Sequence, residues 1–459
     1  MNTMKKIALL STAFSLLLLS SCEKLLDFEP ENQTLASEAL QNEDDLQQFL
    51  NSAYDVLGVY QNGKSQYYGE LLADNLVDPG DNNNDLNEVW SRSTLFFNGT
   101  IGGYYKDLYI SVFRANSLLE NMGQVEGVSE AEQTRMEAEA RFIRALGVFT
   151  AVRLFAQPYG YTSDNSHPGV VAPTEVVRDP TARNTVQECY DQIIEDLEYA
   201  ETNLPADNGN YADQMAAKAL LAKVYFQMND FANASAKSAE VINSGKYDLT
   251  DDPDRYTFER AAETIFGLVS TGGQDNQAEE FYNKYRTDQP TVPLFQLTQE
   301  AFDAGASDTT DLRSAWFEVG QPGTTDEYLG LAKFNANVFY VPLLHLTEMH
   351  LIHAECSAEL GDIAAGIADL NALRDRAFGV GANPVPANLP KNILLDVIRD
   401  ERRIELMGEG ERVHYLKRRG ANGENIEIRG VPWNCDGLIL QFPISENSDV
   451  FDMNPTSGC

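Results

Sequence analysis

Long stretches of this chain repeat apolar side chains every three to four residues, which is the spacing of an amphipathic helix. The first stretch, Glu43–Tyr60, places Leu46, Leu50 and Leu57 on one face. The same spacing predicts helices at Gly103–Met122, Ser129–Phe155, Thr185–Asn203, Asp213–Met228 and Asp230–Ser244. The pattern therefore predicts a mainly α-helical protein with little β-structure.

Two of the helical stretches match in one frame when they are aligned on the tetratricopeptide repeat, a pair of closely packed helices. In both, small residues recur where paired helices must approach, at Ala222, Ala234, Ala354, Gly361 and Gly366, with Tyr225 at the aromatic position. The signature Trp and Pro of the repeat are missing. We therefore predict a scaffold of helix pairs, without a pure solenoid, within residues 43–60, 103–155, 185–244 and 345–378.

Two segments interrupt the helical pattern, residues 61–99 and 246–333. Both have few long periodic runs and many Gly, Asp, Asn and Thr residues. Loops of this length inside a compact domain are commonly functional. We predict that residues 41–459 form a single domain in which these segments supply a long-loop ligand-binding region.

The first 21 residues have the pattern of a signal peptide. Lys5 and Lys6 precede the apolar run Ile7–Leu19, which is too short to span a bilayer. The sequence Leu19-Ser20-Ser21-Cys22 resembles a bacterial lipobox, in which the cysteine is lipidated and becomes the new N-terminus. We therefore predict removal of residues 1–21, lipidation at Cys22 and a tether over residues 22–40. The alternative is an ordinary secretory signal with a chance cysteine.

The formal net charge of −36 argues against binding to nucleic acid and against direct adsorption to anionic lipid headgroups. It suits a solvated extracellular surface, and it would also suit cationic peptides as ligands. Cys189 and Cys356 fall in helical patterns and are predicted to be buried thiols. Cys435 and Cys459 lie in the tail, where an oxidising compartment would permit a disulfide, but the sequence leaves their pairing open.

No common catalytic or nucleotide-binding motif is present: there is no G-x-G-x-x-G, P-loop, H-E-x-x-H or G-x-S-x-G. His350 and His353 share a helical face, but its apolar residues favour a core over a zinc site. Asp78–Asp85 offers oxygen ligands for calcium but lacks the EF-hand glycine and distal glutamate, which favours an Asx-rich turn. The sequence predicts no catalytic residue, metal or cofactor.

Aromatic side chains beside short polar residues are typical of glycan sites, because sugar rings stack on the aromatic faces while polar groups bind the hydroxyls. Both interruptions have this composition, although aromatic residues more often belong to a core. The favoured tryptophans, Trp90 and Trp316, have polar neighbours. The residues predicted to bind ligand are Tyr67, Asp78, Asp81, Asn83, Trp90, Phe96, Trp316 and Tyr328.

The stretch Asn392–Gly420 combines the apolar periodicity of a helix with an unusually high density of charged residues. Acidic and basic side chains recur at offsets of three, four and seven, where helical neighbours meet: Glu401, Arg402, Glu405, Glu409, Arg412 and Arg418. Gly408 and Gly410 predict a bend or a helix end inside the stretch. Taken alone, the pattern is typical of a solvated charged face.

Several motifs, in this order, resemble those of the SusD/RagB family, the surface lipoproteins of Bacteroidetes nutrient-uptake systems. They are the lipobox at Cys22, Glu137–Ala145 (EAEARFIRA), Leu346–Glu355 (LTEMHLIHAE), Leu370–Arg374 (LNALR), Glu401–Arg412 (ERRIELMGEGER) and Phe442-Pro443-Ile444 with Asn454-Pro455. The chain departs from the family at His345, where arginine is common, and at its tail, which ends at Cys459 without the usual glutamine-rich close.

The resemblance implies tetratricopeptide-like helix pairs with a ligand site on loops of the other side. It implies a lipoprotein of the outer membrane, facing the cell exterior, that binds oligosaccharide without catalysis and acts as a lid on a SusC-like TonB-dependent transporter. An oligopeptide ligand is the alternative, and a secreted hydrolase is a second one. In this context we predict that Glu401, Arg402, Glu405, Gly410 and Arg412 hold the last helix against the preceding pairs, with bidentate contacts that lysine would not reproduce.

Overall fold

The computed structural model describes residues 40–80, 84–273, 275–456 and 458–459. The predicted signal peptide, Cys22 and nearly all of the predicted tether lie outside the described residues, as do the candidate ligand-binding residues Asp81 and Asn83. Within the described ranges, no helix combines the length and the apolar character needed to cross a bilayer.

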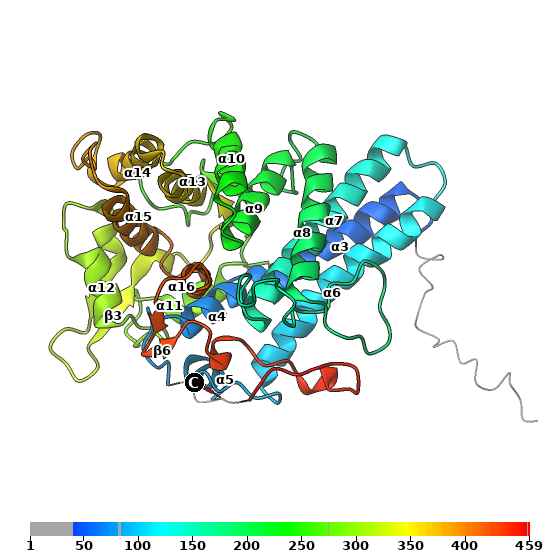
Figure 1. Ribbon diagram of the computed structural model, residues 1–459, viewed down its shortest axis with the longest axis horizontal. Coiled ribbons are helices and arrows are strands. Elements are labelled where there is room, and N and C mark those ends of the chain that lie inside the picture. The colour runs from blue at the N-terminus through cyan, green and yellow to red at the C-terminus, as the bar shows by residue number, and fades with distance from the viewer. Residues whose placement is uncertain (1–39, 81–83, 274, 457) are drawn as a thin grey trace, which may run out of the picture.

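Most of the described chain forms helices that pack side by side in chain order (Figure 1). Neighbours along the chain pack as the pairs α7/α8, α9/α10 and α13/α14, and α10 packs against α13 to join two pairs. The array therefore confirms the predicted tetratricopeptide-like scaffold. In chain order its members are α3 (Glu43–Gln61), α6 (Gly99–Asn121), α7 (Glu130–Phe155), α8 (Val186–Asn203), α9 (Gln214–Gln227), α10 (Phe231–Ile242), α13 (Leu346–Leu360), α14 (Ile363–Phe378) and α15 (Lys391–Glu405). In Figure 1 the array runs from α3, α6 and α7 at the right to α14 at the left, with α15 below α14.

Local chemistry explains where these helices begin and how closely they pack. The Thr185 hydroxyl accepts a hydrogen bond from the Glu188 N–H, and the Glu188 carboxylate accepts one from the Thr185 N–H, which makes a capping box for α8. Between α13 and α14, a Cβ added at Gly366 would lie 2.8 Å from the Ala354 carbonyl oxygen. Only glycine permits that approach, as the repeat pattern predicted.

Three small antiparallel sheets complete the described fold. β1 (Thr264–Leu268) pairs with β4 (Val341–His345), so the strands bracket most of the second interruption and tie both of its ends together. β2 (Phe317–Gly320) pairs with β3 (Tyr328–Leu331), with Phe317 opposite Leu331. β5 (Glu427–Ile428) pairs with β6 (Val431–Pro432) after the last helix.

The two interruptions contain more helix than the sequence predicted. The first holds α4 (Lys64–Leu72) and α5 (Asp85–Trp90), and the second holds α11 (Glu279–Tyr285), α12 (Gln299–Ala306) and the 3-10 turns η3 (Leu312–Trp316) and η4 (Ala332–Phe334). Most of α4 is buried on every side, from Tyr67 to Leu72. A helix buried all round has no polar face, so it lacks the periodicity by which a sequence reveals a helix.

The predicted break in the charged stretch, Asn392–Gly420, is confirmed. It lies at Gly410, where α4 packs against the start of the following helix. α15 ends at Glu405, α16 (Glu411–Ala421) begins after Gly410, and Gly410 has a φ of 83° that favours glycine. A Cβ added at Gly69 would lie 2.1 Å from the Gly410 carbonyl oxygen, and one at Gly410 would lie 2.5 Å from the Gln66 Cα. The two glycines therefore permit direct backbone contact between α4 and the start of α16.

The C-terminal tail folds back over the first helices of the array. The Leu440 N–H donates to the Leu154 carbonyl at 2.8 Å, and Phe442 stacks on Phe155 with ring centroids 5.2 Å apart. Cys435 and Cys459 form a disulfide, which resolves the pairing that the sequence left open. The two remaining described cysteines, Cys189 and Cys356, are buried thiols as predicted.

Candidate ligand-binding site

Trp90, at the end of α5, is a half-buried side chain held from two directions. Its indole Nε1 donates to the Leu76 carbonyl at 3.0 Å. The Arg429 guanidinium carbon lies 4.6 Å from the centroid of the Trp90 rings and covers one face. At most the other face of this ring remains for a ligand.

The most accessible aromatic surface near α5 belongs to Phe97, which the sequence prediction did not include among the ligand-binding residues. Phe97 is 72% exposed, and its ring centroid lies 4.4 Å from that of the half-buried candidate Phe96. Single exposed apolar side chains are common on protein surfaces, so Phe97 becomes a candidate ligand contact only together with its polar neighbours. Sequence periodicity could not single it out, because Phe96 and Phe97 are adjacent in a segment without helical or strand pattern.

Carboxylates and amides surround this aromatic pair. The Asp85 carboxylate accepts hydrogen bonds from the N–H and the hydroxyl of Thr100, at 2.9 and 2.6 Å. The Glu88 carboxylate accepts from the Asn98 side-chain amide at 2.9 Å. Counting the described residues alone, these contacts fix the carboxylates and leave acceptor positions unused, since an ionised carboxylate has about four. The surface formed by Asp85, Glu88, Phe96, Phe97 and Thr100, here named the α5 surface, combines an aromatic face with hydrogen-bond acceptors.

The predicted acidic turn is partly described. Asp78 is exposed, and its Oδ1 accepts a hydrogen bond from the Gly80 N–H at 3.0 Å, which is an Asx turn. Asp81 and Asn83 lie outside the described residues. Among the described residues, no group of three or more His, Cys, Asp or Glu is arranged to hold a metal ion. His350 and His353 both contact the Asp369 carboxylate, the first at 2.8 Å, which gives them a structural partner.

The prediction of exposed aromatic rings at Tyr67, Trp316 and Tyr328 is wrong. Their side chains are 4%, 7% and 4% exposed, respectively. Tyr67 packs edge-on against Tyr68, and the Lys333 ammonium lies 4.8 Å from the centroid of the Trp316 rings. Their polar neighbours in the sequence suggested exposure, but tertiary packing buried Tyr67 and Trp316 in the main core and covered Tyr328 within the β2–β3 hairpin.

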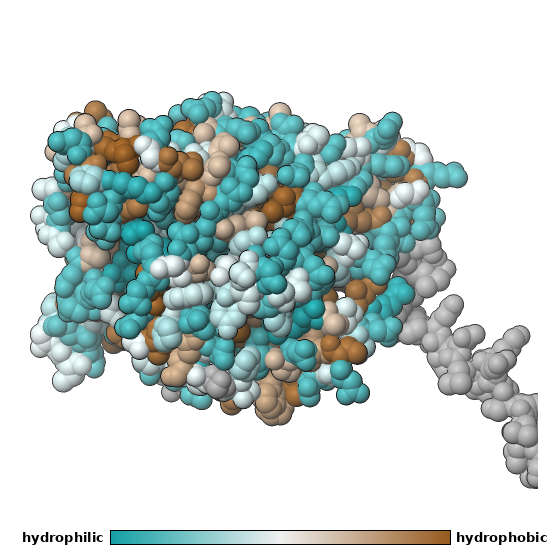
Figure 2. Space-filling view, in the orientation of Figure 1, coloured by the Kyte–Doolittle hydropathy of each residue, from teal (hydrophilic) through white to brown (hydrophobic). Residues whose placement is uncertain are grey.

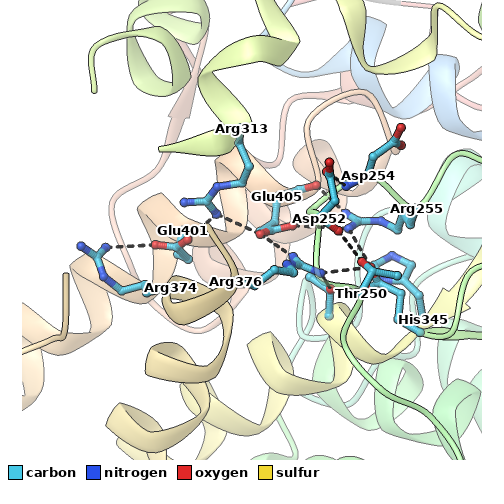
Figure 3. Close-up of polar contacts among 12 residues, drawn as sticks. Thr250, Asp252, Asp254, Arg255, Arg313, His345, Arg374, Arg376, Glu401 and Glu405 are labelled. Atoms are coloured by element: carbon cyan, nitrogen blue, oxygen red, sulfur yellow. Dashed lines mark hydrogen bonds and ion pairs between the residues drawn. The ribbon is translucent and has the colours of Figure 1, made fainter. Parts of the chain in front are cut away.

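The charged motif is buried rather than solvated. Glu401, Arg402 and Glu405 are 3%, 4% and 0% exposed. Figure 3 shows three arginines around the Glu405 carboxylate. Arg376 Nη2 donates to its Oε1 at 2.7 Å, Arg313 Nη1 to the same oxygen at 2.9 Å, and Arg255 Nη1 pairs with Oε2 at 3.4 Å.

Two of these arginines come from the second interruption rather than from the helix pairs. Arg255 precedes β1 and Arg313 belongs to η3, whereas Arg376 lies on α14. Arg313 also pairs with Glu401, and Lys333 of η4 donates to Glu409 at 2.5 Å. The motif therefore holds the last helices to the inserted segment as well as to the preceding pair, which is more than the sequence predicted.

The remaining motif residues have separate partners. Arg402 donates to Glu348 of α13 at 3.0 Å. Arg412 makes a bidentate contact with Asp74, in which its Nε and Nη2 each donate at 2.8 Å. The Gly410 N–H donates to the Glu70 carboxylate at 3.0 Å. The predicted bidentate clamp is confirmed at Arg412, and its partner follows α4.

Burial and charge set the protonation of these groups. Burial raises the pKa of Glu405, but Arg376, Arg313 and Arg255 outweigh it and hold that pKa well below its ordinary value. Glu70 has no such cluster, so burial raises its pKa to about 7. Burial likewise lowers the pKa of Lys333 to about 8, against the opposing charge of Glu409. The motif is therefore a structural ion network, in which burial and neighbouring charges together set the protonation of each group.

Comparison with known proteins matches the chain to two family models. Residues 24–226 match the SusD-like family described as "Starch-binding associating with outer membrane", and residues 271–432 match the SusD family, SusD_RagB. Two SusD-like proteins of Formosa agariphila are similar along their length. Protein P38 is 25% identical over 93% of this chain and 94% of its own, and protein P2 is 28% identical over 90% and 92%.

Solved structures share the fold at low sequence identity. A SusD superfamily protein of Bacteroides vulgatus superposes with a TM-score of 0.79 at 23% identity, covering 90% of this chain and 99% of its own. A laminarin-binding SusD-like protein superposes with a TM-score of 0.71 at 23% identity, covering 90% and 99%. Because the two family models between them match both the N-terminal and the C-terminal part of the chain, this protein is a member of the SusD/RagB family.

Proposed function

We propose that this protein is an outer-membrane lipoprotein, lipidated at Cys22 and facing the cell exterior, that captures an oligosaccharide and acts as a lid on a SusC-like TonB-dependent transporter. The observation that carries the proposal is the match of residues 24–226 to a family described as starch-binding and associating with the outer membrane. A neighbour with the same fold is described as laminarin-binding, which favours a glycan ligand. The ligand is bound without being cleaved.

The α5 surface is the proposed contact for that glycan. Phe97 presents its ring to solvent, and Asp85 and Glu88 lie beside it with unused acceptor positions. A pyranose can stack its C–H face on such a ring while its hydroxyls donate to the carboxylates. Trp90, at the end of α5, and Asp78, which precedes α5 in the chain, remain part of the proposed site, whereas the buried Trp316 does not.

The test is calorimetric titration of the purified protein against a panel of oligosaccharides. We expect Phe97→Ala to weaken binding by tenfold or more, since aromatic contacts of this size are worth about 1–3 kcal/mol. Phe258→Ala is the matched control, because Phe258 is 61% exposed but belongs to another part of the chain. Equal loss of affinity in both variants, or in neither, would remove the α5 surface from the proposal.

An oligopeptide is the second candidate ligand, and the net charge of −36 favours it for basic peptides. Titration with basic oligopeptides alongside the glycans distinguishes the two. Binding of peptides with no binding of any glycan would replace the first proposal. Chromatography of the ligand recovered after binding tests the proposal that the ligand is not cleaved. Any shortened product would contradict it.

The anchor and the partner are tested separately. We expect Cys22→Ala to abolish incorporation of a labelled fatty acid and to release the protein from the outer-membrane fraction. We expect a SusC-like barrel to co-purify with the wild-type protein extracted in mild detergent. Retention of label in Cys22→Ala would contradict Cys22 as the lipidation site. Isolation of the protein without a barrel would contradict its proposed role as a lid on a transporter.

A further inference from the structure

A groove separate from the α5 surface runs along α6. It encloses a cavity of about 460 Å³ between α6, the segment 171–181 and the tail residues 445–451. A cavity of this size suits a small ligand or one side chain of a larger one. Neither the charged motif nor the proposed glycan contact includes it.

Aromatic and aliphatic side chains form most of its walls. On α6, Tyr105 and Tyr109 pack with ring centroids 4.6 Å apart, and Phe113 is 45% exposed. Val177, on the opposite wall, is 37% exposed. In Figure 2, hydrophobic side chains gather among hydrophilic ones at the lower right of the molecule, over the region where Figure 1 places α6 and the folded-back tail.

One carboxylate enters this apolar groove, that of Glu446 at the end of η6 (Ile444–Glu446). Glu446 is half-buried, and among the described residues it forms no ion pair. Burial raises the pKa of Glu446, and a hydrogen bond with the Tyr105 hydroxyl opposes this only in part. The carboxylate therefore lies in largely apolar surroundings, and no cation among the described residues pairs with it directly.

Of two arginines in this part of the fold, Arg178 lines the groove and Arg183 is already occupied by other acceptors. The Arg183 guanidinium, which lies 4.7 Å from the Phe442 ring, donates to the carbonyls of Gly169, Pro168 and Asp452 and to the Asn454 side chain. At the rim, exposed Arg178 is accompanied by the acidic Glu175 and Asp179. Two acids and one arginine leave the rim with a net negative charge, which adds to the field of Glu446.

We propose that this groove binds a primary ammonium group carried on an apolar stem, with the ammonium against Glu446 and the stem along Tyr109 and Phe113. An ammonium gains from a carboxylate in a partly dry site and from aromatic faces within about 6 Å. A methylene stem gains from burial against the apolar walls. A lysine side chain presents such a group on a four-carbon stem, and the strongly negative protein favours cations in general.

The test is titration of the detergent-solubilised full chain with three probes: acetyl-lysine methylamide, its uncharged isostere acetyl-norleucine methylamide, and glucosamine. We expect the lysine probe to bind tenfold or more tightly than the norleucine probe, which lacks the ammonium, and than glucosamine, which lacks the apolar stem. Equal affinity for the lysine and norleucine probes, binding of glucosamine alone, or no binding of any probe at millimolar concentration overturns the proposal.

Two substitutions locate the site. We expect Glu446→Gln to weaken binding of the lysine probe by fivefold or more and to leave the norleucine probe unchanged, whereas Phe113→Ala weakens both. Glu259→Gln, an exposed acid that does not line the groove, is the matched control and should change affinity less than twofold. Unchanged ammonium binding in Glu446→Gln overturns the proposal. The glycan affinity of the α5 surface should be unaffected by Glu446→Gln, which separates this site from the proposed function.

Discussion

The Glu405 carboxylate on α15 accepts a 2.7 Å hydrogen bond from Arg376 Nη2 on α14, and both side chains are almost completely buried. Arg313 and Arg255 approach the same carboxylate from the second interruption. One acid therefore contacts three guanidinium groups from segments up to 150 residues apart in sequence. These arginines also pair with Glu263, Glu401, Glu409 and Asp311. This relationship joins the helical scaffold to the segment inserted into it.

Removal of the central carboxylate should destabilise the protein strongly. In Glu405→Ala the three arginines lose a shared buried counter-ion, and breaking a buried ion pair from one side costs about 3 to 5 kcal/mol. The free energy of unfolding from urea denaturation measures this. Glu300→Ala is the control, because its side chain is 78% exposed and its pair with Arg403 should contribute at most about 1 kcal/mol.

Ligand recognition distinguishes a structural role from a binding role for the same residue. The folded fraction of Glu405→Ala should bind glycan with wild-type affinity. Wild-type stability combined with lost binding would show that the motif contacts ligand.

Glu70 should make the protein less stable as pH rises from about 4.5 to about 7. Its pKa is raised from 4.5 to about 7 in the folded state, so in this window the unfolded state releases a proton that the folded state retains. Above pH 7 the buried charge costs about 3 kcal/mol, on the scale of 1.36 kcal/mol per pKa unit. Glu70→Gln should therefore be more stable than wild type at pH 8 and similar to it at pH 4. Urea denaturation at both values measures the difference, and an equal loss of stability at both would contradict the burial of an unpaired charge.

Arg412→Lys should lower the free energy of unfolding although it keeps the positive charge. Both Arg412 donors reach Asp74 at 2.8 Å in a planar contact, and an ammonium cannot reproduce this geometry. Because the two side chains are 15% and 20% exposed, we expect a loss of about 1 to 2 kcal/mol. Thermal denaturation of Arg412→Lys and Arg412→Ala provides the measurement. Identical melting of Arg412→Lys and wild type would mean that charge alone matters here.

Trp316→Ala should unfold at a lower temperature and keep its glycan affinity when folded. The ring is 7% exposed and carries the Lys333 ammonium on its face, so its removal leaves a cavity and costs about 3 to 5 kcal/mol. Trp316→Phe retains an aromatic face and should lose less. If Trp316→Ala instead melted as wild type and lost glycan binding, the original prediction of a ligand-binding Trp316 would be restored.

Reduction of the Cys435–Cys459 disulfide should loosen the tail. The bond closes a loop with a sequence separation of 24, which corresponds to about 3 kcal/mol in the chain-entropy model. We expect the Cys435→Ala/Cys459→Ala double variant to melt at a lower temperature, and to melt identically with and without dithiothreitol. A wild-type melting temperature that does not respond to reductant would contradict a stabilising role.

Local periodicity was sufficient for the scaffold. Amphipathic helices repeat their pattern within a few turns, so the bounds predicted for the first helix, 43–60, nearly match α3 at Glu43–Gln61. Small residues such as Gly366 revealed close helix packing for the same reason, because a missing side chain is visible in the sequence. By contrast α4 was missed, since burial on every side removes the polar face that periodicity needs.

Exposure and long-range partners were decided only by the tertiary structure. Phe97 and Trp316 have similar polar neighbours along the chain, yet one is 72% exposed and the other 7% exposed, because packing of distant segments covers only the second. The spacing of Glu401, Glu405 and Glu409 was enough to place the three acids close together, on the last turns of one helix and just after its end. That Arg255, Arg313 and Lys333 meet them there could not follow from spacing, because the contacts join segments that only the completed fold brings together.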